Sequence, residues 1–138
     1  MKRILLIGLG KIAYEYDFPR QSNQIRDFLT HIYWANEVGS EVILGIDDQE
    51  DRCKSFTRVT GIPSSVFLED GLRSNPDIII VSCSAKSHLS VMQDLSAMQF
   101  RAESLVIEKP IGLNYSQAKE ILEIARSISP RVYVNFTR

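Results

Sequence analysis

Short apolar runs alternate with amphipathic segments along the chain. Five runs have the length and composition of buried parallel strands, and a sixth, weaker run lies between the second and third. They occupy residues 3–8, 41–46, 65–67, 77–83, 104–107 and 132–136. The run at 77–83 is the clearest of them, because it contains three consecutive isoleucines.

Between these runs, apolar side chains recur with the period of a helix. Four helices are predicted, the first starting near residue 24 and ending at Gly39, and the second ending at Gly61. Asn114 and Gln117 form a capping box for the last helix, which ends at Pro130. The predicted buried stripes are Ile25, Phe28, Leu29, Ile32 and Ala35; Cys53, Phe56 and Val59; Val91, Met92, Leu95 and Met98; and Ala118, Ile121, Leu122, Ala125 and Ile128.

An alternation of strand and helix implies right-handed crossovers and a parallel sheet covered on both faces. The sequence therefore predicts an α/β fold, a doubly wound parallel sheet of the Rossmann type with about six strands and helices on both faces. We expect residues 1–138 to form one domain, since the pattern shows no linker, repeat or low-complexity tract.

A glycine turn follows the first predicted strand. Residues 4–13 read I-L-L-I-G-L-G-K-I-A, which is the pattern G-x-G-x-x-A. In a dinucleotide-binding turn, Gly8 permits the sharp bend, Gly10 lets the backbone approach a pyrophosphate, and Ala13 lets helix and strand touch. The segment that includes Lys11 and Ile12 would then present backbone N–H groups and a helix dipole to the phosphates.

Asp47 ends the second predicted strand, where a carboxylate accepts hydrogen bonds from the ribose hydroxyls of NAD and repels the 2′-phosphate of NADP. Asp48 beside it leaves the assignment open, and Arg52 leaves NADP as an alternative cofactor, because a guanidinium pairs with phosphate. Asp47 lies further from the glycines than the usual spacing of about 20 residues. We attribute the excess to an insertion at residues 14–23, which is polar and aromatic and has no helical stripe.

Composition narrows the function classes. The chain has 16 Lys and Arg against 17 Asp and Glu, a net charge of -1, which gives no general attraction for nucleic acid or an anionic membrane. No apolar run reaches the ~20 residues that cross a bilayer. Cys53 and Cys83 are widely separated and are expected to be reduced core residues of a cytoplasmic protein. No metal site is expected.

A second motif makes the prediction more specific. Residues 107–110 read I-E-K-P directly after a predicted strand. Together with the N-terminal G-L-G-K-I-A, this resembles the Gfo/Idh/MocA family of nicotinamide-dependent oxidoreductases over essentially the whole chain. Similar segments are Asn75-Pro76-Asp77 before an apolar strand, His88 just after that strand, and V-N-F-T-R at residues 134–138.

The resemblance implies roles for individual residues. Lys109 would lie near nicotinamide and substrate as the catalytic residue, and Glu108 would orient its surroundings. Cys83 and Ser84 stand where the family has Thr-Pro beneath the nicotinamide, so this turn is expected to differ. His88 is expected to be structural or to contact the cofactor, and His31 to be structural. The predicted cofactor-binding residues are Gly8, Gly10, Lys11, Ile12, Ala13, Asp47, Cys83, Ser84, His88 and Glu108.

The resemblance also implies what residues 1–138 lack. The family's substrate domain, which supplies substrate contacts and an acid/base residue, is expected to be absent. We therefore expect the NAD-binding part of an oxidoreductase acting on a sugar- or polyol-like substrate, inactive alone and self-associating to cover apolar surface. The alternatives are a non-catalytic dinucleotide-binding or interaction module and, less well matched by the E-K-P motif, a methyltransferase-like domain.

Overall fold

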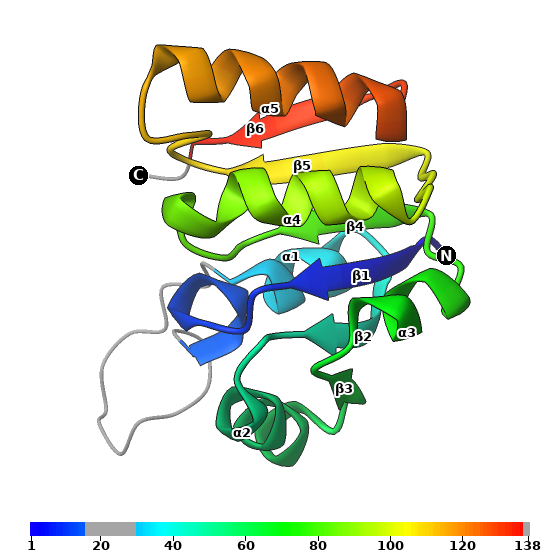
Figure 1. Cartoon of the computed structure of the whole chain (residues 1–138). Helices are drawn as coiled ribbons and strands as arrows, with labels where there is room; N and C mark the ends of the chain where they lie inside the picture. The colour runs from blue at the N-terminus through cyan, green and yellow to red at the C-terminus, as the bar shows by residue number, and fades with distance from the viewer. Residues whose placement is uncertain (16–29, 137–138) are drawn as a thin grey trace.

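The computed structural model describes residues 1–15 and 30–136. Its strands are β1 (Arg3–Ile7), β2 (Glu41–Ile46), β3 (Ser64–Ser65), β4 (Ile78–Val81), β5 (Ser104–Glu108) and β6 (Val132–Asn135). Its helices are a short π-helical turn η1 (Lys11–Glu15), α1 (His31–Glu37), α2 (Glu50–Thr60), α3 (Leu68–Arg73), α4 (Ala85–Ala97) and α5 (Tyr115–Ile128). Figure 1 shows the strands side by side with their arrows pointing the same way.

The six strands form one sheet in the order β3-β2-β1-β4-β5-β6, and every neighbouring pair is parallel. The chain moves outward in one direction from β1 to β3 and then crosses back to β4 on the other side of β1. This reversal is the arrangement of a doubly wound dinucleotide-binding fold, so the predicted fold class is confirmed.

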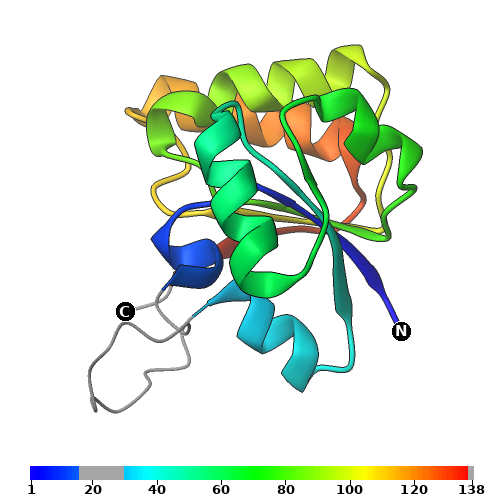
Figure 2. The same ribbon diagram turned by 90° about the horizontal axis from the view of Figure 1, so that it is seen from below.

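Alternate residues of the central strands separate two cores. Leu5 and Ile7 of β1 face α3, α4 and α5, whose buried partners include Met92 and Ile121. Ile4 and Leu6 face the other way, toward η1, α1 and α2. In Figure 2, α3, α4 and α5 cover one face of the sheet, while η1 and α1 lie on the other. A strand buried on both faces reads as a continuous apolar run, and this is why β1 and β4 were clear in the sequence.

Most of the helix boundaries follow the sequence signals. Gly61 closes α2 with a left-handed φ of 74°, as its position predicted. Asn114 caps α5 by accepting a hydrogen bond from the Gln117 N–H at 2.8 Å, and the Gln117 side chain accepts one from the Leu113 N–H at 2.8 Å. The predicted capping box is thus present, with the return bond shifted by one residue.

Three details of the pattern were wrong. Val59 was expected in the core, but it is 39% exposed, because α2 buries only Cys53 and Phe56. The third strand is β3 at Ser64–Ser65, one residue earlier than predicted and shorter. Helix α3 was not predicted, since its six residues are too few to show a periodic stripe.

The described part of the first predicted helix is α1. Thr30 has an extended backbone and its side chain accepts a hydrogen bond from the Tyr33 N–H, so α1 starts at His31. The predicted start near residue 24, and the apolar positions at 25, 28 and 29, lie outside the described residues. Tyr14 and Glu15 were assigned to an insertion, but they belong to η1, and Tyr14 is buried with its ring edge-on to Phe56. The rest of that segment lies outside the described residues.

Candidate functional site

The predicted site residues gather at the edge of the sheet where the parallel strands end. The glycine turn follows β1, Asp47 follows β2, Cys83 and Ser84 follow β4, and Lys109 follows β5. Because β1 lies between β2 and β4, these segments meet where the strand order reverses. Ligands of open α/β sheets bind in the crevice at this point.

The two glycines of the turn have different surroundings. Gly8 has φ +93°, and a Cβ there would lie 2.3 Å from the Cys83 backbone nitrogen, so only glycine fits. At Gly10, apart from its two neighbours in the chain, no atom of residues 1–15 and 30–136 lies within 4 Å of the position that a Cβ would occupy. Gly8 therefore shapes the turn, whereas Gly10 leaves open space beside it. Within η1, Ala13 is fully buried in the core, while Lys11 is exposed and Ile12 is partly exposed.

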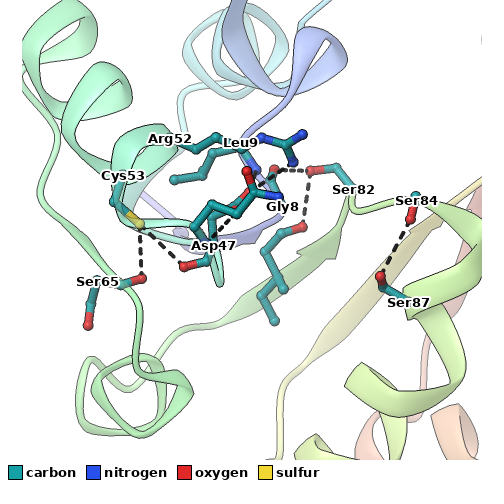
Figure 3. A network of polar contacts seen from close by, with 11 residues as sticks. Gly8, Leu9, Asp47, Arg52, Cys53, Ser65, Ser82, Ser84 and Ser87 are labelled. Atoms are coloured by element: carbon teal, nitrogen blue, oxygen red, sulfur yellow. Dashed lines mark hydrogen bonds and ion pairs between the residues drawn. The ribbon is translucent and has the colours of Figure 1, made fainter.

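Asp47 is buried, with 5% of its surface exposed, and both of its carboxylate oxygens are engaged. One oxygen, Oδ2, accepts a hydrogen bond from the Leu9 N–H of the glycine turn at 2.9 Å. The other, Oδ1, accepts one from the Gln49 N–H at 2.9 Å. Arg52 lies 3.7 Å from Oδ2 (Figure 3). Since a carboxylate oxygen accepts more than one hydrogen bond, these contacts orient Asp47 and leave it capacity for a ligand hydroxyl.

The turn after β4 carries Cys83, which is partly buried, and Ser84, which is exposed. Burial raises the pKa of the Cys83 thiol to about 11, so the residue is a neutral thiol near pH 7. The Ser84 hydroxyl lies 3.4 Å from that of Ser87 in the first turn of α4.

His88 has no exposed surface and lies between two carbonyl oxygens. Its Nδ1 is 2.8 Å from the Ile111 oxygen, and its Nε2 is 2.9 Å from the Cys83 oxygen. The imidazole thus bridges the turn after β4 and the loop after Lys109. Both ring nitrogens are occupied by these backbone contacts, which is the arrangement of a structural histidine.

Glu108 ends β5 as part of a buried polar cluster. Its Oε1 accepts a hydrogen bond from the Asn135 amide at 2.6 Å and lies 2.7 Å from the His31 Nε2. The contact between His31 and Glu108 is therefore a close ion-pair contact, because the His31 Nε2 does not meet the geometry of a hydrogen bond. Burial raises the pKa of the Glu108 carboxyl, but the contacts with His31 and Asn135 outweigh burial and hold this pKa below its usual value.

The cluster fixes the chain directly before Lys109. Lys109 is exposed, and the peptide bond that joins it to Pro110 is cis. Its ammonium group lies at the surface next to an anchored strand end. The backbone around Lys109 is therefore held by Glu108 on one side and by the His88–Ile111 contact on the other.

Comparison with known protein families decides the lineage of this arrangement. Residues 2–136 match the Gfo/Idh/MocA family model, described as an oxidoreductase family with an NAD-binding Rossmann fold. The chain belongs to the Gfo/Idh/MocA family. The resemblance seen in the G-x-G-x-x-A and E-K-P motifs is thus confirmed, and the matched region is the family's NAD-binding Rossmann domain.

Solved structures with the same fold include two WlbA dehydrogenases, both in complex with NADH and UDP-GlcNAcA. The enzyme from Chromobacterium violaceum is 20% identical in sequence and superposes with a TM-score of 0.72. The alignment covers 97% of this chain and 34% of the C. violaceum chain. The one from Bordetella pertussis has 18% identity and a TM-score of 0.72, with 96% and 36% covered.

A myo-inositol 2-dehydrogenase from Lactobacillus plantarum has 16% identity and a TM-score of 0.64, with 97% of this chain and 36% of its own covered. The Gfo/Idh/MocA domain described here thus spans about a third of the length of these structures. No curated protein matches the chain in sequence.

Two further findings concern the described part of this Gfo/Idh/MocA domain. Residues 1–15 and 30–136 contain no helix that is both long and apolar enough to cross a membrane. The same residues contain no group of three His, Cys, Asp or Glu side chains arranged to hold a metal ion. A hollow of about 510 Å³ lies between α2 and β3, but none of the predicted site residues lines it.

Sequence reasoning missed two residues that hold this site together. Asn135 pairs with Glu108 across β5 and β6, and only the strand register reveals that contact. Ser82 was passed over as part of an apolar strand, yet its hydroxyl contacts the Gly8 carbonyl oxygen at 2.6 Å. A polar residue inside an otherwise apolar run was the one signal that marked it.

Proposed function

We propose that this chain is the dinucleotide-binding part of an NAD-dependent dehydrogenase that oxidises a sugar- or polyol-like substrate. The observation that carries the proposal is the glycine turn, with open space at Gly10, beside the buried carboxylate of Asp47 at the reversal of strand order. The substrate class rests on the related structures, which bind UDP-GlcNAcA or are named for myo-inositol.

The proposed division of labour follows from the positions of the side chains. When bound, NAD supplies the acceptor for hydride. Gly8 would shape the turn, Gly10 would leave room for its pyrophosphate, and Asp47 would accept hydrogen bonds from the adenosine ribose. Lys109 would donate a hydrogen bond to the substrate oxygen and stabilise the negative charge that forms there as the hydroxyl proton passes to a base of the substrate domain, while hydride passes to NAD and the carbonyl forms. Glu108, held by His31 and Asn135, would keep the strand end before Lys109 in place.

Asp47 also sets the expected choice between the two nicotinamide cofactors. A buried carboxylate that is already anchored cannot move away from the additional phosphate of NADP. Arg52, at 3.7 Å from Asp47, offsets part of this repulsion. We therefore propose that NAD binds more tightly than NADP, with NADP excluded incompletely.

The test is calorimetric titration of the chain with NADH and with NADPH at one salt concentration. We expect tighter binding of NADH, and equal or reversed affinities would refute the assigned role of Asp47. Gly10→Val should abolish binding of both while leaving the unfolding transition nearly unchanged, because a side chain would enter open space. Normal NADH binding by Gly10→Val would refute the proposed use of the glycine turn.

We further propose that the complete enzyme includes a second, substrate-binding domain. Turnover by a version that carries such a domain separates a dehydrogenase from a non-catalytic NAD-binding module. Free Cys53 and Cys83 favour a reducing compartment such as the cytoplasm. Exposed Tyr133 and Phe136, on and just after the edge strand β6, favour self-association, which a size measurement in solution tests.

A further inference from the structure

One peptide unit of the glycine turn is held at both of its polar ends. The Gly8 carbonyl oxygen accepts a hydrogen bond from the Ser82 hydroxyl at 2.6 Å. The N–H of the same peptide unit belongs to Leu9 and donates to Asp47 at 2.9 Å. Figure 3 shows Ser82 and Asp47 approaching the turn from two different strand ends, those of β4 and β2.

Both side chains that hold this peptide are buried. Ser82 is 8% exposed and Asp47 is 5% exposed, so water does not readily replace either contact. The Ser82 oxygen also lies 3.1 Å from the Ile7 oxygen, but a hydroxyl has one proton, and the shorter contact to Gly8 is the better hydrogen bond. Loss of this hydroxyl would leave the Gly8 oxygen without its side-chain donor.

The remaining freedom of the turn is also small. The Gly8 N–H donates to the Ile46 oxygen at 2.7 Å, and the Cys83 backbone blocks the space beside the Gly8 Cα. The Ser82–Asp47 pair thus fixes the orientation of the Gly8–Leu9 peptide unit, which lies one residue before Gly10. A rotation of this unit would require both buried hydrogen bonds to break together.

We propose that Ser82 is a positioning residue for dinucleotide binding. It holds the Gly8–Leu9 peptide so that the backbone at Gly10 is already arranged for a pyrophosphate before the ligand arrives. Binding then carries no free-energy cost for ordering the turn, so the dinucleotide binds more tightly. The inference rests on the proposed function, since it concerns the same glycine turn.

Ser82→Ala tests the proposal against a matched control, Ser129→Ala. Ser129 is a 2% exposed serine that also contacts two carbonyl oxygens, those of Glu103 and Arg131, at 3.1 and 3.0 Å. It lies between α5 and β6, at the opposite edge of the sheet from the glycine turn. Both variants lose a buried hydroxyl, but only one loses a contact with the turn.

The readouts are the NADH dissociation constant and the urea midpoint without ligand. We expect both variants to unfold at lower urea than the wild type. Ser82→Ala should also raise the NADH dissociation constant about fivefold, the equivalent of one hydrogen bond of about 1 kcal/mol. Ser129→Ala should leave it unchanged. A merely structural serine would lower the midpoint without altering the affinity.

A second pair of variants and a change of ligand sharpen the test. Ser82→Thr keeps the hydroxyl, whereas Ser82→Val has a methyl group in its place and nearly the same volume as Ser82→Thr. The Ser82→Thr variant should therefore bind NADH more tightly than the Ser82→Val variant. The loss in Ser82→Ala should appear with ADP, which carries a pyrophosphate, and be absent with adenosine.

The outcomes separate this inference from the function beneath it. If the wild-type chain binds NADH and Ser82→Ala has the same dissociation constant, the role of Ser82 is refuted but the proposed function is not. Equal NADH affinities of the Ser82→Thr and Ser82→Val variants would lead to the same conclusion. Absence of NADH binding by the wild-type chain would overturn both. A loss of adenosine affinity as large as the loss of ADP affinity would also refute it, because the defect would then not lie at the phosphates.

Discussion

Replacement of Gly8 by alanine should destabilise the fold severely, whereas the same change at Gly10 should not. At Gly8, an added methyl group would lie 2.3 Å from the Cys83 nitrogen and 2.6 Å from its Cα, both of which are backbone atoms that cannot swing aside. The φ of +93° adds strain for any residue with a Cβ. At Gly10, the methyl group would meet no atom of the described part of the chain within 4 Å beyond the adjoining residues, and φ is not positive.

The size of the effect follows from these two costs. A non-glycine residue in a disfavoured backbone region costs about 1–3 kcal/mol. Overpacking of a rigid site adds about 1–3 kcal/mol, and here the obstacle is main chain. We therefore expect Gly8→Ala to lower the free energy of unfolding by roughly 4 kcal/mol, a large part of the ~5–15 kcal/mol typical of a domain. Gly10→Ala should stay within about 0.5 kcal/mol of the wild type.

Urea unfolding followed by far-ultraviolet circular dichroism measures both variants, and NADH titration supplies the second axis. Gly10→Ala should be folded but bind NADH more weakly, since its methyl group occupies space proposed for the pyrophosphate. The reasoning fails if Gly8→Ala is as stable as the wild type, because the turn would then relax around a side chain. It also fails if the two variants lose equal stability.

Three further predictions concern the end of β5. Ionised Glu108 has a folded-state pKa below its unfolded value, so its stabilisation is present above the unfolded pKa and disappears as pH falls through the folded pKa. The stability difference between the wild type and Glu108→Gln, measured by urea unfolding, should therefore be larger at pH ~7 than at pH ~3, and an unchanged difference would refute the ionic account. In a version with a substrate domain, Lys109→Ala should lower kcat at least ~100-fold and change the NAD dissociation constant little, as expected for a polar group lost from the reacting centre. Steady-state kinetics and NAD titration measure the two quantities. A weakened NAD affinity with little change in kcat would make Lys109 a cofactor-binding residue. Residues 1–138 alone should show no NAD reduction with sugars or polyols, because one lysine cannot fix a substrate at the ~3–3.5 Å that hydride transfer requires; robust turnover would show that the site is complete.

The strands and the glycine turn could be predicted because their causes are local. A strand buried on both faces must be apolar throughout, and the central strands β1 and β4 show such a run. Gly61 and Asn114 act on the backbone within a few residues of themselves, so their helix ends are visible in the sequence. By contrast, α3 has too few residues for a period to be recognised.

The contacts that hold the site could not be predicted, because they join residues far apart in the chain. Ser82 and Gly8 are separated by 74 positions, and His31 and Glu108 come from α1 and β5. Single-residue preferences do not specify such pairs; the strand order and register do. His31 was expected only to be structural, and its carboxylate partner became visible when α1 and β5 were brought together.

The contact between Asn135 and Glu108 has a consequence for how this protein can be divided. β6 is the outermost strand on its side of the sheet. Its Asn135 nevertheless donates a side-chain hydrogen bond at 2.6 Å to the carboxylate of Glu108, which directly precedes Lys109. A fragment cut before Val132 would retain every residue of both sequence motifs and still lose one partner of Glu108. When domains are exchanged between relatives, whether in the laboratory or by recombination, the junction therefore belongs after Asn135. In a chimera joined within or before β6, Glu108 and Lys109 would come from one parent protein and the residue at position 135 from the other.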